Sequence, residues 1–395
     1  MSAPAATTPP SRMPFAVSHV AAGFVAVLVG YTSSVAIIFQ AAMAAGATPA
    51  ELSSWMWALG IGMGATCIGL SLYFRTPILT AWSTPGAALL VTGLEGLNMH
   101  QAIGVFLSTS VLITLAGASG TFQRLMEWVP RHLAAAMLAG ILVRFGMDTF
   151  SSMQSQPLLV AAMFATWLAA RLITPRYTVP LALAAGIVCA GLMGLLRLDT
   201  LDWTPARPVL MLPEFSWSAF VGVALPLFIV SMTSQNVPGL AVLRANGYTT
   251  PASPLISWTG LAGVVLAPFG GFSFNLAAIT AAICMSRDAD PEPQRRYMAA
   301  VWAGVFYLFT GIFGATVVSL FAAFPIELVA AIAGLALLGT IAGSLAGALQ
   351  EEKGRDAAIV TFLGTASGLA LFGIGSAFWG LLLGMLVHGL SPRRV

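Results

Sequence analysis

The chain has 395 residues, of which 58% are hydrophobic and only 8% are charged, and its mean hydropathy is +0.89. A soluble protein of this length cannot bury so much apolar surface, so the composition predicts a protein that crosses a membrane many times. The net charge of +3 arises from basic residues in scattered short loops, which excludes a nucleic-acid-binding face. Cys67, Cys189 and Cys284 lie in apolar stretches without metal-ligand spacing, which argues against disulfides and a bound metal.

The N-terminus, residues 1–13, is polar and rich in Ala, Thr and Pro, and we expect a disordered cytoplasmic tail there. Arg12 and the apolar residues after it could instead form a signal peptide cleaved near 42–44. The apolar run is much longer than the roughly 7–15 apolar residues of a signal peptide, so we favour a first membrane segment.

Fourteen apolar stretches follow the tail, and we expect each to be a membrane segment of an all-α polytopic protein. The first seven are 15–45, 52–73, 77–94, 101–122, 129–147, 157–173 and 179–196, and the second seven are 217–243, 254–267, 268–284, 297–321, 325–349, 357–371 and 375–390. One long polar loop separates the two sets. The sequence therefore predicts a first repeat over 14–197, an extracytoplasmic linker over 198–214 and a second repeat over 215–395.

The basic residues predict how the chain is oriented. With the N-terminus in the cytoplasm, every Lys and Arg except Arg144, Arg197 and Arg207 falls on the cytoplasmic side. This asymmetry follows the positive-inside rule and predicts an even number of segments with both termini cytoplasmic.

The third segment, 77–94, contains an interruption. A proline begins it, and the residues through Trp82 and Ser83 have the pattern of an extended stretch. Thr84 is then the expected cap of a helix whose first position is taken by Pro85. The segment should be a short extended piece followed by a half-helix.

The tenth segment, 268–284, repeats this design. A proline and two glycines break any helix at its start, and 272–274, Phe-Ser-Phe, alternates like a strand. Asn275 is the expected cap of a helix over 276–283. At bilayer depth such an interruption is tolerated only where the freed backbone groups line a cavity or are buried in protein, so the pair marks a binding site.

The two interruptions are copies of one another. The sequence WSTPGAA at 82–88 aligns with FSFNLAA at 272–278 at an offset of 190 residues, and 46–49 resembles 247–251. Because seven is an odd number of segments, the second copy begins on the opposite side of the membrane, and the halves are inverted repeats. This is the usual construction of secondary transporters.

Two half-helices from inverted repeats should point their N-termini toward each other near the middle of the bilayer. Each brings unpaired N–H groups and about half a positive charge, which favours an anion without any basic side chain. Backbone groups near Thr84, Gly86, Asn275 and Leu276 would then bind a carboxylate. The alternative is that Thr84 and Asn275 only cap their own helices.

A polar cluster, SMTSQN, begins at Ser231 in the eighth segment. At helical spacing Gln235 shares a face with Ser231 and Ser234, and Asn236 projects beside it. The first segment has the polar sequence YTSS, starting at Tyr31, at the corresponding place. These groups could face the substrate, or they could only join helices to one another.

Aromatic residues flank both interruptions and are expected to form apolar walls for a ring, although tryptophans also serve as interfacial anchors. With the serines of the extended pieces, the candidate substrate contacts are Tyr31, Trp82, Ser83, Thr84, Gly86, Gln235, Asn236, Phe272, Ser273, Phe274, Asn275 and Leu276.

The sequence carries no enzyme signature: it has no P-loop, no GxSxG, no HExxH and no paired histidines. We therefore expect a transporter that is not an enzyme and needs no cofactor. A channel or an uncoupled anion transporter is the alternative, and a structural membrane protein is a more distant one because it would not need paired broken helices.

The motifs SQNVPGLAVLRANGY (234–248), PFGGFSFNLAAITAAICMSRDADP (268–291) and WSTPGAALL (82–90) resemble the BenE family of benzoate/proton symporters. The resemblance runs along essentially the whole chain after the tail. It implies a bacterial inner-membrane protein that imports benzoate with protons, in the fourteen-segment fold of the nucleobase transporters. In that fold segments 1–4 and 8–11 form a core, 5–7 and 12–14 form a gate, and a homodimer is plausible.

One departure from that fold is informative. The nucleobase transporters have glutamates on the eighth and tenth segments, where this chain offers Gln235, Asn236 and Asn275. A carboxylate beside a benzoate anion would be unfavourable at low dielectric, whereas amides can donate N–H groups. The loss also removes the obvious proton carrier, so we consider Asp148 and Glu95 as candidates for proton coupling. The expected function is benzoate import by proton symport, with an uncoupled facilitator or a carrier of another small organic anion or nucleobase-like compound as the alternative.

Overall fold

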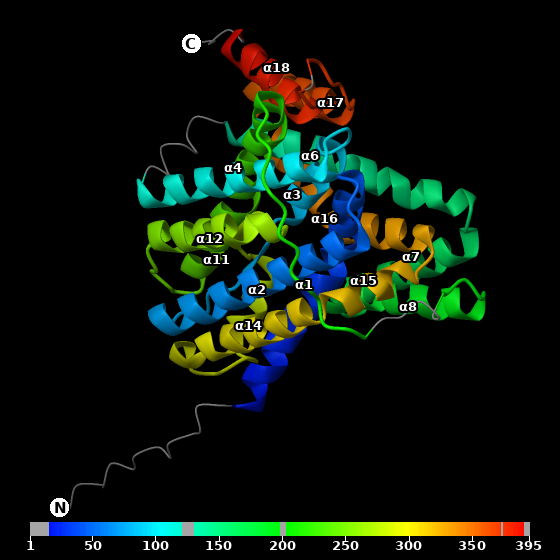
Figure 1. Ribbon diagram of the computed structural model, residues 1–395, viewed down its shortest axis with the longest axis vertical. Coiled ribbons are helices and arrows are strands. Elements are labelled where there is room, and N and C mark those ends of the chain that lie inside the picture. Colours follow the sequence, from blue (N-terminus) through cyan, green and yellow to red (C-terminus); the bar gives the residue numbers. More distant parts are fainter. Residues whose placement is uncertain (1–15, 121–129, 198–202, 373, 391–395) are drawn as a thin grey trace, which may run out of the picture.

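The computed structural model describes residues 16–120, 130–197, 203–372 and 374–390, and the chain within them is mostly helical (Figure 1). The predicted tail, the end of the fourth segment and the start of the linker lie outside these residues. The helices of the first half are α1 (Val17–Ala44), α2 (Pro49–Phe74), α3 (Thr84–Gly93), α4 (Met99–Ala118), α6 (Arg131–Ser151), α7 (Pro157–Ile173) and α8 (Thr178–Leu192).

The second half contains α9 (Trp217–Ala219), α10 (Leu225–Ser231), α11 (Val237–Ala245), α12 (Ala252–Leu266), α13 (Ile279–Cys284), α14 (Tyr297–Ile312), α15 (Gly314–Ala322), α16 (Ile326–Leu349), α17 (Arg355–Ala366) and α18 (Ser376–Leu390). Two short strands, β1 (Thr80–Trp82) and β2 (Phe274–Leu276), interrupt the helices. Within the described residues, seven helical stretches are long and apolar enough to cross a membrane, or eight if one bent pair is a single span. The chain is therefore a polytopic, mostly helical membrane protein.

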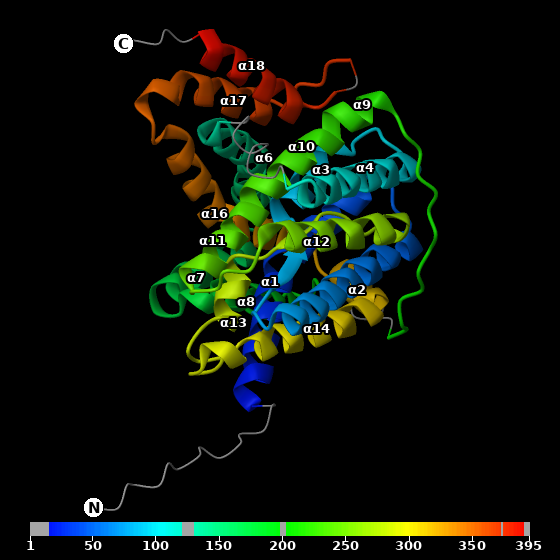
Figure 2. The same cartoon turned by 90° about the vertical axis from the view of Figure 1, so that its left-hand side faces the viewer.

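Two predicted segments differ from straight helices. The eighth is continuous over 217–245 but contains two π-helical turns, Phe220–Ala224 and Met232–Asn236, so that α9, α10 and α11 follow one line in Figure 2. The predicted segment 297–321 is instead two helices, α14 and α15, bent by 67° at Phe313. A π-helical turn shifts the residues after it around the helix axis and is frequent at functional sites.

The helices pack in two groups. In one, α2 packs on α14 and α15, α12 packs on α4, and α1 packs on α14 and α3. In the other, α16 and α17 pack on α6, α17 packs on α18, and α7 packs on α8 (Figure 1). Contacts between the groups include those of α1 with α16 and α8 and of α3 with α6.

Glycine permits the closest of these crossings. At the crossing of α2 and α14, a Cβ atom built on Gly60 would lie 2.4 Å from the Cα of Gly311. Any larger residue would push the two helices apart, so the backbones of the two halves of the chain meet directly here.

The linker after 202 has no regular secondary structure, yet it is fixed to the helices along its length. The N–H groups of Ala206 and Met211 donate to backbone carbonyls of Ile312 and Pro268, each at 2.7 Å. Glu214 N–H donates to His100 O at 2.8 Å, so the linker crosses the ends of α2, α4, α12 and α14 as a strap (Figures 1 and 2).

A buried hydrogen bond joins the start of α1 to the loop before α14. His19 Nε2 lies 2.8 Å from Asp290 Oδ2, and both residues are buried. Because Ala16 N–H points at His19 Nδ1 (3.3 Å), Nε2 is the nitrogen that donates. Burial alone would raise the pKa of Asp290, but the hydrogen bonds from Glu292 N–H and His19, with the charges of His19 and Arg295, hold it below its ordinary value.

We predict that Asp290→Asn lowers the free energy of unfolding at neutral pH by roughly 1.5–3 kcal/mol, the contribution of a charged hydrogen bond. Because the folded-state pKa of Asp290 is lowered, wild type keeps this advantage above the ordinary carboxyl pKa and loses it as the pH falls through the lowered value. Thermal unfolding in detergent as a function of pH measures this difference in stability between wild type and Asp290→Asn. Asp288→Asn, an exposed position in the same loop, is the control and should match wild type. Equal stability of D290N and wild type at neutral pH would show that the contact between His19 and Asp290 does not stabilise the fold.

Candidate substrate site at a two-stranded ribbon

The two interrupted segments pair with each other. Strands β1 and β2 form an antiparallel ribbon in which Thr80 faces Leu276, Ala81 faces Asn275 and Trp82 faces Phe274. The strands are 194 residues apart in the chain (Thr80 to Phe274), rather than the 190 of the sequence alignment. Each predicted interruption is therefore a short strand followed by a half-helix, and the inverted relation of the two halves remains a prediction.

The caps of the half-helices also differ from the prediction. Ser83, and not Thr84, caps α3: its hydroxyl accepts from Gly86 N–H at 2.9 Å, and Thr84 is already the first residue of the helix. Asn275 caps no helix, because it is the central residue of β2, and α13 begins only at Ile279. The extended backbone around Asn275 is stabilised by a partner strand from the other half of the chain, which local sequence cannot reveal.

The ribbon places the two half-helices on opposite sides of itself. Since the strands are antiparallel, α3 leaves one end of the ribbon and α13 leaves the other, with both N-termini next to the strands. The first-turn N–H groups of a helix have no carbonyl of their own helix to donate to. The helix α13 has only six residues, so the ten-residue α3 has the larger dipole.

Two buried asparagines join the eighth segment to the ribbon. Asn236 Nδ2 donates to Asn275 Oδ1 at 2.9 Å, and Asn236 Oδ1 accepts from Leu276 N–H at 3.0 Å. Asn275 Nδ2 donates to the carbonyl of Ser273. The amides of Asn236 and Asn275 and the N–H of Leu276 are thus engaged within the protein, and they fix the Met232–Asn236 π-helical turn to β2.

The other polar residues of this turn divide into satisfied and unsatisfied groups. The hydroxyls of Thr233 and Ser234 donate to carbonyls of their own helix, Ile229 O (2.8 Å) and Val230 O. Gln235 is half-buried, and its amide makes no hydrogen bond to any part of the protein that the structure describes. The hydroxyl of Ser231 is fully buried and likewise has no partner among the described residues.

The first segment contributes an aromatic pair. The rings of Tyr31 and Trp82 meet edge to face with centroids 4.8 Å apart, and Trp82 Nε1 donates to Ser34 Oγ at 2.7 Å. The Tyr31 hydroxyl is buried beside Thr310 without a well-formed hydrogen bond to the described residues. A buried hydroxyl in this state is costly unless a ligand or water completes it.

Ser273 carries backbone strain next to the ribbon. Its φ of 41° lies in the left-handed region, which is unusual for a residue with a side chain, and its carbonyl accepts from Ser83 N–H at 3.1 Å. Its hydroxyl is buried and has no partner among the described residues. Such strain is typical of positions that the surrounding structure holds for function.

Two predicted pocket residues lie in the protein core instead. Phe272 packs between the rings of Trp55 and Phe106 at centroid distances of 6.0 and 5.3 Å. Phe274 fills the space over Gly62 on α2, where an added Cβ would lie 2.3 Å from the ring. Both phenylalanines are fully buried, so they anchor the ribbon on α2 and α4.

Thr80, which was not among the residues predicted from sequence, fixes β1 to α2. Thr80 Oγ1 lies 2.6 Å from Thr66 Oγ1, and its N–H donates to Cys67 Sγ at 3.1 Å. Thr80 is fully buried. A polar residue two positions before Trp82 in an otherwise apolar segment was the available signal.

The residues in and next to the ribbon differ in how deeply they are buried. Ala81, Thr84 and Gln235 are half-buried, whereas Trp82, Ser83 and Asn275 around them are buried. Three cavities of about 250, 870 and 810 Å³ are lined by residues outside the ribbon. The half-buried positions in and near the ribbon are thus a small side chain of β1, the first residue of α3, and an amide without a partner among the described residues.

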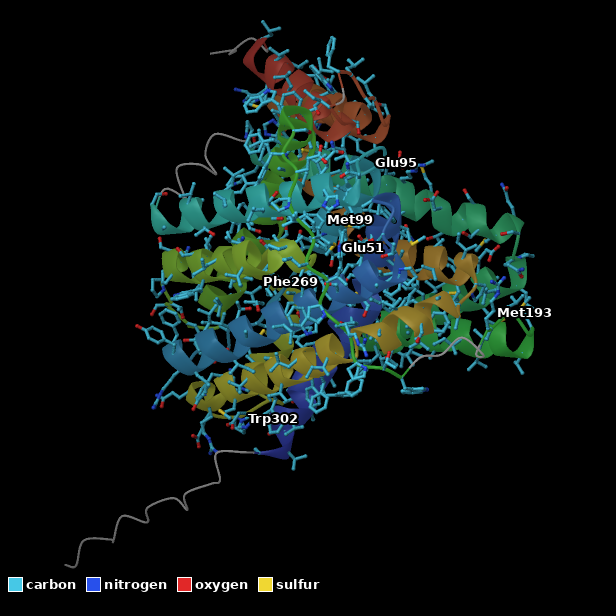
Figure 3. The ribbon with its side chains drawn as sticks, viewed as in Figure 1. Glu51, Glu95, Met99, Met193, Phe269 and Trp302 are labelled. Atoms are coloured by element: carbon cyan, nitrogen blue, oxygen red, sulfur yellow. The ribbon has the colours of Figure 1, made fainter. Side chains whose placement is uncertain are left out.

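The proton-coupling candidates are both on the surface. Asp148 is exposed on α6 and forms no ion pair with Arg144 within the described residues. Glu95 is exposed in the turn after α3 (Figure 3). Neither lies in the ribbon.

Two solved structures share the fold of this chain. The transmembrane domain of the cyanobacterial bicarbonate transporter BicA superposes with a TM-score of 0.62 over 94% of this chain and 97% of that one, at 12% identity. A structure of SLC26A9 gives 0.60 over 94% of this chain, which spans 65% of that protein, at 13% identity. These likenesses show that the protein has the SLC26/BicA transporter fold.

The family follows from sequence. The family model for the benzoate membrane transport protein, BenE, matches residues 13–390, and the chain belongs to this family. The inner membrane protein YdcO of Escherichia coli K12 is 53% identical over 92% of this chain and 93% of its own. The benzoate membrane transport protein of Acinetobacter baylyi is 42% identical over 95% and 96%. The resemblance seen in the motifs is confirmed, and the chain is a multi-pass inner-membrane protein rather than an enzyme.

We predict that Asn236→Ala destabilises the fold, because it leaves Asn275 Oδ1 and Leu276 N–H buried without partners. The expected loss is roughly 1–3 kcal/mol for each such group, measured as a lower unfolding midpoint in detergent. Gln235→Ala, the neighbouring amide without an internal partner, should unfold like wild type. If both variants unfold like wild type, Asn236 does not hold the ribbon.

Proposed function

We propose that this protein carries benzoate across the bacterial inner membrane together with protons, by alternating access. The family, the fold of anion transporters and a relative that is named a benzoate membrane transport protein support this proposal. The observation that carries the site assignment is the half-buried Gln235, whose amide has no partner among the described residues beside a ribbon whose other amides are engaged.

The carboxylate of the substrate binds at the N-terminus of α3 in this proposal. Thr84 begins this helix and is half-buried. Pro85 has no N–H and the Gly86 N–H donates to Ser83 Oγ, so the Thr84 N–H and the helix dipole are what favour an anion there. Gln235 supplies a further N–H donor. Gly86 keeps the first turn free of side-chain bulk, and an added Cβ there would lie 2.7 Å from Leu227.

The ring of the substrate packs on the Tyr31–Trp82 pair. These two rings already meet edge to face, and an aromatic ligand adds a third ring with the same geometric preferences. The hydroxyls of Tyr31, Ser231 and Ser273 are buried without hydrogen-bond partners among the described residues. Asn236, Asn275, Phe272, Phe274 and Leu276 support the site from behind rather than contact the substrate.

The absence of a charged side chain fits a substrate that is itself an anion. A glutamate facing benzoate in a low-dielectric site would repel it, and a buried arginine would make release slow. Backbone dipoles and an amide attract the carboxylate moderately, which suits a carrier that has to release its substrate on the other side.

The fourteen segments comprise a core of segments 1–4 and 8–11 and a gate of segments 5–7 and 12–14. The two groups in which the helices pack support this division, and so does the BicA likeness. The substrate site belongs to the core, whose α1 and α3 face α16, α8 and α6 of the gate. Movement of the core against the gate would expose the ribbon to the two sides alternately.

The test of this function is uptake of labelled benzoate into proteoliposomes of purified protein with an inward proton gradient. We expect accumulation that needs the protein and is abolished by an uncoupler, and protein-free liposomes correct for benzoic acid that crosses unaided. Gln235→Ala should weaken half-saturation about fivefold or more, equivalent to one hydrogen bond to a charged group, while unfolding like wild type. Uptake that ignores the gradient would indicate an uncoupled facilitator, and absence of protein-dependent flux would refute benzoate as substrate.

The proton carrier is tested separately with the double variant Asp148→Asn/Glu95→Gln. If either carboxylate carries the coupled proton, the variant should still exchange labelled for unlabelled benzoate but should no longer accumulate it against a gradient. The single variants then identify which one is needed. Full accumulation by the double variant would exclude both residues and direct attention to the buried His19–Asp290 pair.

A further inference from the structure

One of the three cavities lies where the strap crosses the ends of the helices, away from the ribbon. Its volume is about 870 Å³, within the range of roughly 300–1,000 Å³ that is usual for small-molecule sites. The walls are Phe39 and Met43 of α1, Val318 and Phe321 of α15, and the linker residues Thr204 and Arg207. The rings of Phe39 and Phe321 touch, with centroids 5.0 Å apart.

Among the described residues that line this cavity, Arg207 is the one with a charged side chain. Its side chain is exposed and forms no ion pair or hydrogen bond with the part of the chain that the structure describes. The acidic residue next to the cavity wall, Glu51, is committed elsewhere: its carboxylate accepts from Thr48 N–H (2.8 Å) and Thr48 Oγ1 (2.7 Å). The guanidinium is therefore available to an anion.

The backbone holds Arg207 over the cavity. On one side of it, Ala206 N–H donates to Ile312 O at 2.7 Å, and on the other side Val209 N–H donates to Ser54 Oγ at 2.9 Å. The two bonds tie the strap to α14 and α2 within three residues of sequence. An arginine on a fixed backbone loses less entropy when it binds a ligand than one on a free loop.

We propose that this cavity is an outer binding site for an aromatic carboxylate, from which substrate proceeds to the ribbon. This inference rests on the proposed transport function and on the predicted extracytoplasmic position of the linker. Arg207 pairs with the carboxylate through its planar fork, and the ring packs on the edges of Phe39 and Phe321 and on Met43. Arg207 is one of the few basic residues that the positive-inside pattern places outside. Its charge thereby raises the local concentration of anionic substrate at the extracytoplasmic end of the carrier.

Protection from labelling tests occupancy directly. The background keeps Cys67 and Cys284, which are buried, and replaces the half-buried Cys189 by alanine. In it, Thr204→Cys places a thiol in the cavity wall, and Leu210→Cys places one on the exposed strap outside the cavity. In intact cells, benzoate should slow the reaction of T204C with a membrane-impermeant maleimide and leave L210C unaffected. Benzamide, which lacks the charge, and acetate, which lacks the ring, should protect weakly. Protection should disappear when Arg207→Gln is added, and protection that persists in that background would overturn the role of Arg207.

Transport kinetics give the second readout. Arg207→Gln should raise the half-saturation concentration of benzoate uptake by roughly two- to fivefold, the range for an exposed ion pair, with the maximal rate unchanged. Arg207→Lys should recover part of the effect, and Arg197→Gln, which removes a predicted extracytoplasmic charge outside the cavity, should match wild type. Wild-type uptake with unchanged half-saturation in R207Q would reject the outer site and leave the transport function standing. Absence of uptake by wild type would instead reject the transport function itself.

Discussion

The structure depends on how a membrane protein satisfies the backbone of a broken helix. Residues 80–82 and 274–276 leave helical geometry in the middle of apolar segments, where each unpaired N–H or C=O group would cost several kcal/mol. The antiparallel pairing of β1 with β2 solves this for both segments at once. Each interruption is therefore stabilised by a strand from the other half of the chain.

The polar groups around the ribbon then divide by function. Thr80, Asn236 and Asn275 hydrogen-bond within the protein and fix the strands to α2 and to the eighth segment. Gln235, Ser231 and the hydroxyl of Tyr31 remain without partners in the described chain. Satisfied buried groups rigidify a site, whereas unsatisfied ones are retained where a ligand completes them. Both kinds occur side by side in the π-helical turn Met232–Asn236. Asn236 is hydrogen-bonded to β2, and Gln235 next to it has no partner among the described residues.

Helix packing explains how proteins with so few identical residues can have the same fold. BicA and SLC26A9 share only 12–13% of residues with this chain, yet the same arrangement of helices recurs. What has to be retained is small: glycines where backbones meet, as at Gly60 and Gly311, and two interruptions able to pair. The side chains around the ribbon can differ among proteins of one fold, because function depends on the residues of the site and not on the fold.

The sequence by itself determined the membrane class, the positions of most helices, the duplicated interruption and the family, because apolar runs, prolines and glycines act locally and leave a direct mark on the chain. The segment predicted at 157–173 is the helix α7 with the same bounds. Tertiary structure decided the rest. Whether Asn275 would cap a helix or lie in a strand depended on Ala81, its partner 194 residues away in the chain. The burial of Phe272 and Phe274 against α2 and α4, the engagement of Asn236, and the freedom of Gln235 are likewise set by contacts between segments, which no local pattern of residues specifies.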